Sequence, residues 1–395
     1  MESKKIGILT HYYNNHNYGG CLQAFALVEQ LQKMGYSAEQ ICYIASDNIS
    51  VSQKIRRSLK SDGFFGLLKI IFILLTGRIK AIISKQNPEN KNIIIRSKAM
   101  SDFRNFSIPH SQTVYYANTI SKCKDYDTYI CGSDQVWRFH NSRVDAGYWL
   151  TFAADEAKRI SYAASVSMKE IPKKYHAEIK QTLLKYRAIS VREEEAKEQI
   201  EEIVAGEKPV ERVLDPTLLM TGDEWNAYCA ENPYEKESYI FAYLLGDKKE
   251  DRRYIKDFAE RNQLKIITIP YLLGKYRSCD KKFGDIQLFD VNPALFLSLI
   301  RDAKYVMTDS FHGTVFSCLF HREFYLFKRS TDNDVKSMNS RIYSLLSLFD
   351  CEDRIISPFD DQKESRKDIN FEKIEEVLQK EREKSKNFLY EALKN

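Results

Sequence analysis

Short apolar runs alternate with helix-like patterns along the whole chain. The first run, residues 5–10 (KIGILT), predicts a strand, and residues 21–35 predict a helix that Gly35 ends. Further strands are predicted at residues 37–44, 127–133, 159–165, 187–193 and 210–216. Because strands separated by helices are typical of βαβ units, this half of the chain predicts a parallel sheet.

The alternation starts again after residues 229–238, a polar stretch that contains a proline. The later elements are, in order, a strand at 238–246, a charged helix at 247–263, a strand at 264–270, a helix at 292–303, a strand at 304–310, a helix from Gly313 and a strand at 323–328. We therefore predict two domains, residues 1–231 and 232–395. The expected fold class is α/β, with two doubly wound, Rossmann-like domains that face a cleft. Ligands of such sheets bind outside the carboxyl ends of the strands.

One segment, residues 54–85, interrupts this rhythm. Its middle, residues 64–75, is apolar except for Lys69 and is shorter than the ~20 residues that span a bilayer. Basic residues flank this middle on both sides: Arg56, Arg57, Lys60, Arg78, Lys80 and Lys85. The pattern suits a helix that lies in an anionic membrane surface, and equally a buried helix or helical hairpin with solvated basic ends.

Composition narrows the class of protein. The 395 residues include 60 basic and 55 acidic side chains, and this small positive excess gives no support for a nucleic-acid partner. The eight cysteines form no CxxC pair and no cluster with histidines, so we expect reduced thiols and no metal site. The N-terminus enters a strand without a signal-peptide pattern, which predicts a cytoplasmic location.

The first candidate loop joins the first predicted strand to the helix after it. It contains Asn17, Gly19 and Gly20. Glycines let the backbone approach a ligand, and a helix N-terminus offers N–H groups to an anion. The loop matches neither a P-loop nor a GxGxxG motif, so a plain turn explains it equally well.

Two further loops follow strands of the first domain. Ser133, Asp134 and Gln135 are small or polar side chains at a strand's carboxyl end, which fits a ligand site. The alternative is that Asp134 caps a helical turn. Asp215–Pro216 ends the last strand of this domain, and because proline prevents the strand from continuing, we interpret it mainly as a structural turn.

Two strand-to-helix junctions carry side chains suited to an anionic substrate. Arg192 could grip a carboxylate or phosphate in a fork, or it could pair with the acidic residues 193–195 that follow it. His312 precedes Gly313 and Thr314 at the start of a helix in the second domain. A proton donor beside an anion-binding helix end suits chemistry on a phosphorylated substrate.

Five stretches, in this order, resemble the polysaccharide pyruvyl transferase family. They are NYGGCLQAFAL, GSDQVW, SVRE, VLDPTLL and DSFHGTVFS, and the resemblance extends over roughly residues 5–350. It implies the two-Rossmann-domain fold of B-type glycosyltransferases. It also implies transfer of a pyruvyl group from phosphoenolpyruvate, the co-substrate, onto sugar hydroxyls, often as a cyclic ketal, with no further cofactor and no metal.

The resemblance also implies roles for particular residues. His312 matches the general acid, and Arg192 matches an arginine that holds the donor. The N–H groups of Gly313 and Thr314 are expected to bind the donor. The acceptor sugar is then left to the two first-domain loops, namely Asn17, Gly19, Gly20, Ser133, Asp134 and Gln135.

The sequence departs from the family pattern at one donor-binding position. Ser310 stands where many members have an arginine two residues before the histidine. Our hypothesis is that Arg341, at the start of a nearby predicted helix, compensates for the missing charge. The expected acceptor is a lipid-linked repeat unit at the inner face of the cell membrane, where residues 54–85 would dock. The final helix, residues 370–394, is expected to pack back on the first domain.

Two other functions remain open at this level. A glycosyltransferase that uses a nucleotide sugar would have the same fold and the same anion-binding helix end. A non-catalytic scaffold of a surface-polysaccharide assembly complex, held at the membrane by residues 54–85, would explain Ser310. The identity of the donor separates the two enzymes.

Overall fold

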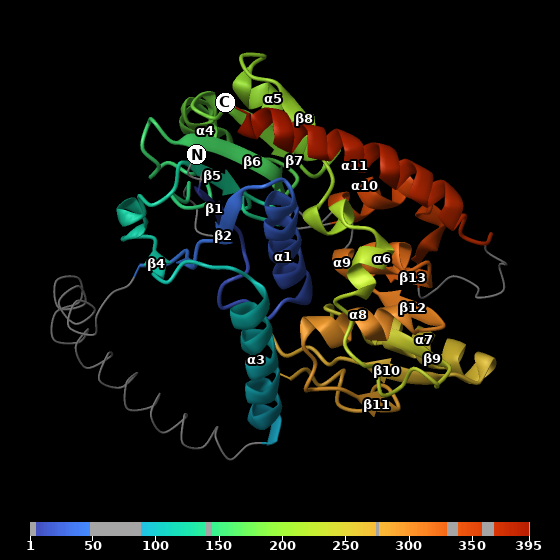
Figure 1. Cartoon of the computed structure of the whole chain (residues 1–395). Helices are drawn as coiled ribbons and strands as arrows, with labels where there is room; N and C mark the ends of the chain where they lie inside the picture. The colour runs from blue at the N-terminus through green and yellow to red at the C-terminus, as the bar shows by residue number, and fades with distance from the viewer. Residues whose placement is uncertain are drawn as a thin grey trace.

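The computed structural model describes residues 5–47, 88–139, 144–273, 276–329, 339–357 and 367–394. Two six-stranded parallel sheets form two domains, with helix α1 between them (Figure 1). Within these ranges no helix is long and apolar enough to cross a membrane. Residues 54–85, for which membrane contact is predicted, lie outside the described residues.

The N-terminal sheet has the strand order β2-β1-β5-β6-β7-β8. Its strands are β1 (Lys5–Leu9), β2 (Ser37–Gln40), β5 (Thr128–Cys131), β6 (Lys158–Ala164), β7 (Ala188–Val191) and β8 (Val210–Arg212). The helices of this half are α1 (Tyr18–Lys33), α3 (Pro88–Ser107), α4 (His176–Leu184), α5 (Glu194–Val204) and α6 (Gly222–Asn226). The predicted strand at 37–44 is divided, because its end, β3 (Tyr43–Ile44), leaves the sheet and pairs with β4 (Tyr115–Tyr116).

The C-terminal sheet has the order β11-β10-β9-β12-β13-β14, which is the doubly wound order 3-2-1-4-5-6. Its strands are β9 (Tyr239–Tyr243), β10 (Lys265–Thr268), β11 (Ile286–Gln287), β12 (Tyr305–Thr308), β13 (Glu323–Phe327) and β14 (Ile355–Ile356). The helices are α7 (Lys249–Asn262), α8 (Pro293–Arg301), α9 (Phe311–Leu319), α10 (Ser340–Phe349) and α11 (Phe371–Leu393). The predicted fold class, two doubly wound α/β domains, is confirmed.

Helix α1 lies at the interface between the domains. It is buried on nearly all sides, as expected for a helix that is apolar all round. The Tyr18 ring stacks on Phe296 of α8 with 4.6 Å between centroids, and its hydroxyl donates to the carbonyl of Val291 at 3.0 Å. Further along α1, Phe25 packs against Trp225, which in turn contacts Phe316 of α9. The start of α1 is thereby held against the C-terminal domain.

The final helix, α11, contacts the N-terminal domain (Figure 1). Phe388 and Leu389 belong to the same buried cluster as residues of β1. Ser385 accepts a hydrogen bond from the backbone N–H of Leu214 at 3.0 Å, and Arg382 donates to the carbonyl of Leu218 at 2.8 Å. These bonds secure the segment that follows β8, which matters for the site described below.

Asp251, in the first turn of α7, predicts a pH-dependent stability. Burial raises the pKa of its carboxyl to about 7; Lys248 opposes this rise and Asp309 adds to it. Because the folded pKa exceeds the unfolded value, stability falls as the pH rises from about 4 to 7. We expect Asp251→Asn to raise the free energy of unfolding at pH 8 by up to about 4 kcal/mol, and by less than half of that at pH 5. Urea unfolding at the two pH values measures this; equal gains at both would contradict it.

Candidate active site

His312 lies in the first turn of α9, directly after β12. The Ser310 hydroxyl accepts from the N–H of Gly313 at 3.3 Å, and its carbonyl accepts from the N–H of Thr314 at 3.0 Å. This cap starts the helix at Phe311, two residues earlier than predicted. A Cβ at Gly313 would lie 2.7 Å from the Thr308 hydroxyl, so glycine lets α9 pack on β12. Ser310 therefore already engages both N–H groups that were expected to bind the donor.

The N-terminus of α1, in the N-terminal domain, contacts the imidazole of His312, which belongs to the C-terminal domain. The Asn17 side chain accepts from the N–H groups of Gly19 at 3.0 Å and Gly20 at 3.4 Å, and so caps α1. A Cβ added to Gly19 would lie only 1.9 Å from Nδ1 of His312. Glycine is thus required where the two helix ends approach, and the first predicted loop does lie beside the predicted acid.

Replacing Gly19 by Ala is expected to displace the His312 ring or to separate the two helix ends. Overpacking of this kind costs about 1–3 kcal/mol. We expect the Gly19→Ala variant to have a lower melting temperature and reduced turnover, measured by calorimetry and by product formation. Wild-type turnover in a folded Gly19→Ala variant would show that the contact is not needed for activity.

Asp215 stands at the centre of the polar network. It caps a short 3₁₀ helix (Pro216–Leu219) and is 1% exposed. Its Oδ1 accepts from the Thr217 hydroxyl at 2.7 Å and lies 3.6 Å from Nε2 of His312. Its Oδ2 accepts from Nη1 of Arg192 at 2.8 Å and from the Ser133 hydroxyl at 3.0 Å. The interpretation of Asp215 as mainly a structural turn was therefore incomplete.

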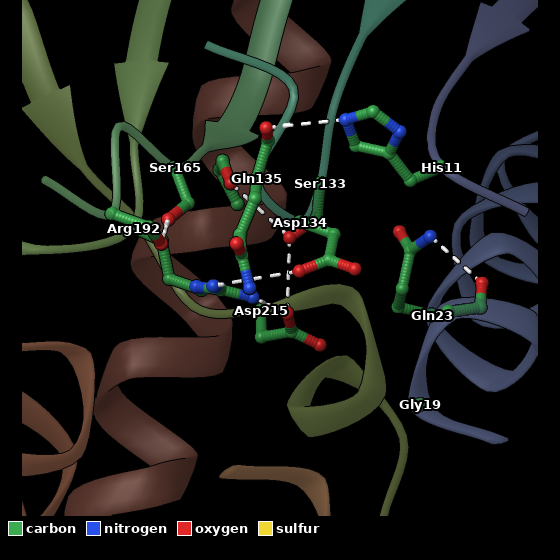
Figure 2. A network of polar contacts seen from close by, with 12 residues as sticks. His11, Gly19, Gln23, Ser133, Asp134, Gln135, Ser165, Arg192 and Asp215 are labelled. Carbon is green, nitrogen blue, oxygen red and sulfur yellow. Dashed lines mark hydrogen bonds and ion pairs between the residues drawn. The ribbon is translucent and has the colours of Figure 1, made fainter. Parts of the chain in front are cut away.

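Arg192 extends from the end of β7 toward Asp134 and Asp215 (Figure 2). Its Nε donates to Glu193 at 3.0 Å, Nη2 lies 3.9 Å from Asp134, and the guanidinium carbon lies 4.5 Å from the centre of the Phe311 ring. Burial alone would lower the pKa of Arg192, but Glu193, Asp215 and Asp134 raise it above its ordinary value. The sequence left two alternatives for Arg192, namely a ligand-binding side chain and a partner of the acidic residues that follow it. In the structure Arg192 pairs with Glu193 and also faces the site.

The loop after β5 presents its three predicted residues in different ways. Ser133 is fully buried, and its hydroxyl donates to Asp215 and to the carbonyl of Ala163. Asp134 adopts a left-handed φ of 63° and is buried; burial raises the pKa of its carboxyl, but Arg192 and His312 outweigh burial and lower it. Gln135 is partly exposed, and its carbonyl lies 3.2 Å from Nε2 of His11 (Figure 2). The Ser133 hydroxyl thus has its hydrogen-bond partners inside the protein, whereas Gln135 lies nearer the surface.

Arg341, in the first turn of α10, lies on the same aromatic ring as Arg192. Its guanidinium carbon is 6.0 Å from the centre of the Phe311 ring. Burial lowers the pKa of Arg341 to about 9, and the positive charges of Arg329 and Arg192 contribute to this. Arg192, Asp215, Phe311 and Arg341 line one narrow cavity of ≈ 30 Å³. Arg341 therefore adds a second positive charge to a cavity in which the charge of Arg192 is already paired with Glu193 and Asp215.

The described residues contain no group of three His, Cys, Asp or Glu side chains that could hold a metal ion. Two features of the site escaped the sequence reasoning: the contact of Asp215 with His312, and the dependence of that histidine on Gly19. The VLDPTLL motif was the signal for Asp215, because it is one of the five stretches that carry the family resemblance, although its local pattern indicates only a turn.

Fold and site together define a protein of two doubly wound α/β domains, with a candidate acid held between the domains. The family model for polysaccharide pyruvyl transferase matches residues 17–331. The chain therefore belongs to the polysaccharide pyruvyl transferase family, and the predicted membership is confirmed. The family is one of transferases.

Solved structures give weaker likenesses. The UDP-GlcNAc 2-epimerase from Methanocaldococcus jannaschii is 11% identical, with 95% of this chain and 99% of that chain covered and a TM-score of 0.44. The UDP-N-acetylglucosamine 2-epimerase from Rickettsia bellii is 8% identical, with 98% and 96% covered and a TM-score of 0.44. The E. coli heptosyltransferase WaaC with ADP is 9% identical, with 87% and 97% covered and a TM-score of 0.37. A search of curated proteins found no significant match.

Proposed function

We propose that this protein transfers the pyruvyl group of phosphoenolpyruvate to a sugar of a polysaccharide repeat unit and forms a pyruvyl ketal. One observation carries the proposal: His312, a side chain able to donate a proton, lies 3.6 Å from Asp215, and Asp215 lines one cavity together with Arg192 and Arg341, which are both buried. A proton donor in a site that contains two arginines suits a small substrate with a phosphate and a carboxylate. Membership of the family supports the same reaction.

The proposed reaction begins with proton transfer from His312 to the methylene carbon of phosphoenolpyruvate. Positive charge develops at C2, a sugar hydroxyl attacks that carbon, and the hydroxyl proton leaves. Phosphate then departs from C2, a second hydroxyl of the same sugar attacks to close the ketal, and its proton passes to the released phosphate. The protein must hold the donor, supply one proton and exclude water, and these tasks need no further cofactor.

The arginines are proposed to hold the anionic groups of the donor. Arg192 has one nitrogen, Nη2, without a hydrogen-bond partner among the described residues, although it is buried. The lowered pKa of Arg341 reflects burial together with repulsion by Arg329 and Arg192, and a bound anion would offset that repulsion. In this proposal Arg341 supplies the charge that Ser310 lacks, and the N–H groups of Gly313 and Thr314 serve mainly to build the cap of α9.

The acceptor side is proposed to lie toward α1 and the loop after β5. Gly19 contacts the His312 ring, so a sugar that reaches the donor passes near Asn17, Gly19 and Gly20. Gln135, on the loop that also carries Ser133 and Asp134, is partly exposed. A lipid-linked acceptor at the inner face of the cell membrane, with docking by residues 54–85, remains part of the proposal.

The test is phosphate release from phosphoenolpyruvate by the purified chain with a panel of lipid-linked and aryl galactosides, glucosides and mannosides. Mass spectrometry of the sugars should show the added mass of one pyruvyl ketal on a single acceptor. Turnover of a nucleotide sugar without phosphate release from phosphoenolpyruvate would replace this proposal with a glycosyltransferase. Turnover of neither donor, with any acceptor of the panel, would favour a scaffold.

A further inference from the structure

We propose that Asp215 positions His312 for proton transfer: its carboxylate holds the Nε2 side of the imidazole, so that Nδ1, on the Gly19 side, delivers the proton. The inference rests on the proposed function and adds to it a specific nitrogen atom and a positioning residue from the other domain. Three observations carry it, namely the fixed carboxylate, the unequal surroundings of the two ring nitrogens and the charges around them.

The carboxylate of Asp215 cannot turn freely. Oδ1 accepts from the backbone N–H of Thr217 at 3.1 Å and from its hydroxyl at 2.7 Å. Oδ2 accepts from Arg192 and Ser133, at 2.8 and 3.0 Å. Four hydrogen bonds inside the protein therefore fix which oxygen faces His312, and that oxygen is Oδ1.

The two nitrogens of the His312 ring have different surroundings. Nε2 is buried, has no hydrogen-bond partner among the described residues and lies 3.6 Å from Oδ1 of Asp215. This separation exceeds a normal hydrogen bond, but catalytic contacts of this kind often tighten only when the substrate binds. Nδ1 lies on the side of Gly19, whose backbone packs so closely on the ring that a Cβ there would be 1.9 Å from this nitrogen, whereas Nε2 faces a carboxylate. The partner of one nitrogen selects which nitrogen is available for chemistry.

The charges around the ring come from both domains. Asp215 and Asp134 both interact with His312. Arg192, Arg341 and His11 in turn act on Asp134. Burial would raise the pKa of the Asp215 carboxyl, but His312 and Arg192 hold it well below its usual range. Asp215 is therefore ionised at neutral pH and can stabilise a charged imidazole beside it.

The proton balance follows from this arrangement. The imidazolium transfers its Nδ1 proton to the methylene carbon of phosphoenolpyruvate and becomes neutral. The remaining proton stays bonded to Nε2, which donates a hydrogen bond to the Asp215 carboxylate. Asp215 does not itself become protonated. The hydroxyl that attacks C2 then returns a proton to Nδ1, and the proton of the second hydroxyl leaves with the released phosphate. No oxidant, reductant or further reactant is required.

Three variants separate this role from a purely structural one. Asp215→Asn removes the charge, Thr217→Val loosens the oxygen that faces His312, and Ser133→Ala loosens the oxygen that faces Arg192. Phosphate release is measured across pH. We expect Asp215→Asn to lower kcat by about 100-fold or more and to shift the high-pH fall of kcat to lower pH. Thr217→Val should shift this fall in the same direction with a smaller decrease in kcat, and Ser133→Ala should leave the pH of the fall unchanged.

An independent readout is the tautomer of His312, measured by ¹⁵N NMR of the ring in the full chain. The neutral ring of the wild type should carry its proton on Nε2 alone, and Asp215→Asn and Thr217→Val should each give a mixture. Identical tautomers and an unshifted high-pH fall of kcat in both variants would overturn the inference. If Asp215→Asn does not fold, Thr217→Val decides. If the wild type releases no phosphate, the proposed function fails, while the NMR comparison still decides whether Asp215 orients His312.

Discussion

Replacing His312 by Gln is expected to lower the rate of phosphate release from phosphoenolpyruvate by about 100-fold or more. Glutamine keeps most of the volume and hydrogen-bonding capacity of the ring but cannot exchange a proton near neutral pH. Because His312 lies between two helix ends, a similar volume should also preserve the packing against Gly19. Initial rates at saturating donor and acceptor measure the effect on kcat.

His321 provides the matched control for this variant. It follows α9, is exposed and has a left-handed φ of 53°, a conformation that asparagine tolerates. We expect His321→Asn to keep wild-type turnover and to lose at most a little stability, because its ring stacks on Phe371. Full activity of His312→Gln beside a normal His321→Asn would remove His312 from the mechanism.

Replacing Arg341 by Gln is expected to raise KM for phosphoenolpyruvate by about 10- to 100-fold. The estimate corresponds to the loss of one charge-assisted hydrogen bond, about 1.5–3 kcal/mol. The lowered pKa of Arg341 means that the folded protein disfavours this charge, so below about pH 9 its removal also relieves a destabilising repulsion. If Arg341→Gln raises KM for the donor without a large loss of stability, Arg341 binds the donor rather than only supporting the fold. Steady-state kinetics and thermal unfolding measure the two quantities.

Arg261, exposed in the last turn of α7, is the control for the loss of one positive charge. Its replacement by Gln should leave KM for the donor unchanged, because screening makes distant surface charges ineffective. An Arg341→Gln variant with wild-type KM would show that Arg341 does not compensate for Ser310. The missing family arginine would then need another explanation.

Much of the fold could be predicted because it depends on local patterns. The buried strands β5 and β12 are short apolar runs, and the helices between them have their own caps and breakers. The start of α9 was misplaced by two residues because the glycine in the pattern was taken as its beginning. The actual signal was Ser310, whose side chain caps the helix.

The site was predicted only in part. His312 and Arg192 were chosen as candidates because each stands at a strand-to-helix junction, where ligands of parallel sheets bind. Asp215 was interpreted as a turn because the proline after it explains the local backbone. Its contact with His312 joins two domains and cannot be inferred from neighbouring residues in the chain. Ser133 was expected to face the acceptor, yet its hydroxyl is buried against Asp215.

The sequence by itself determined the class of fold and the family and pointed to His312 and Arg192 as site candidates. Periodicity and ordered motifs, on which these inferences rest, are properties of the chain. Only the tertiary structure decided what surrounds them. It brought Gly19 against the imidazole of His312, placed Asp215 beside Nε2 and gathered Arg192 and Arg341 around Phe311. These contacts depend on how α1 packs between the domains, and packing between distant segments is set by shape and burial rather than by local pattern.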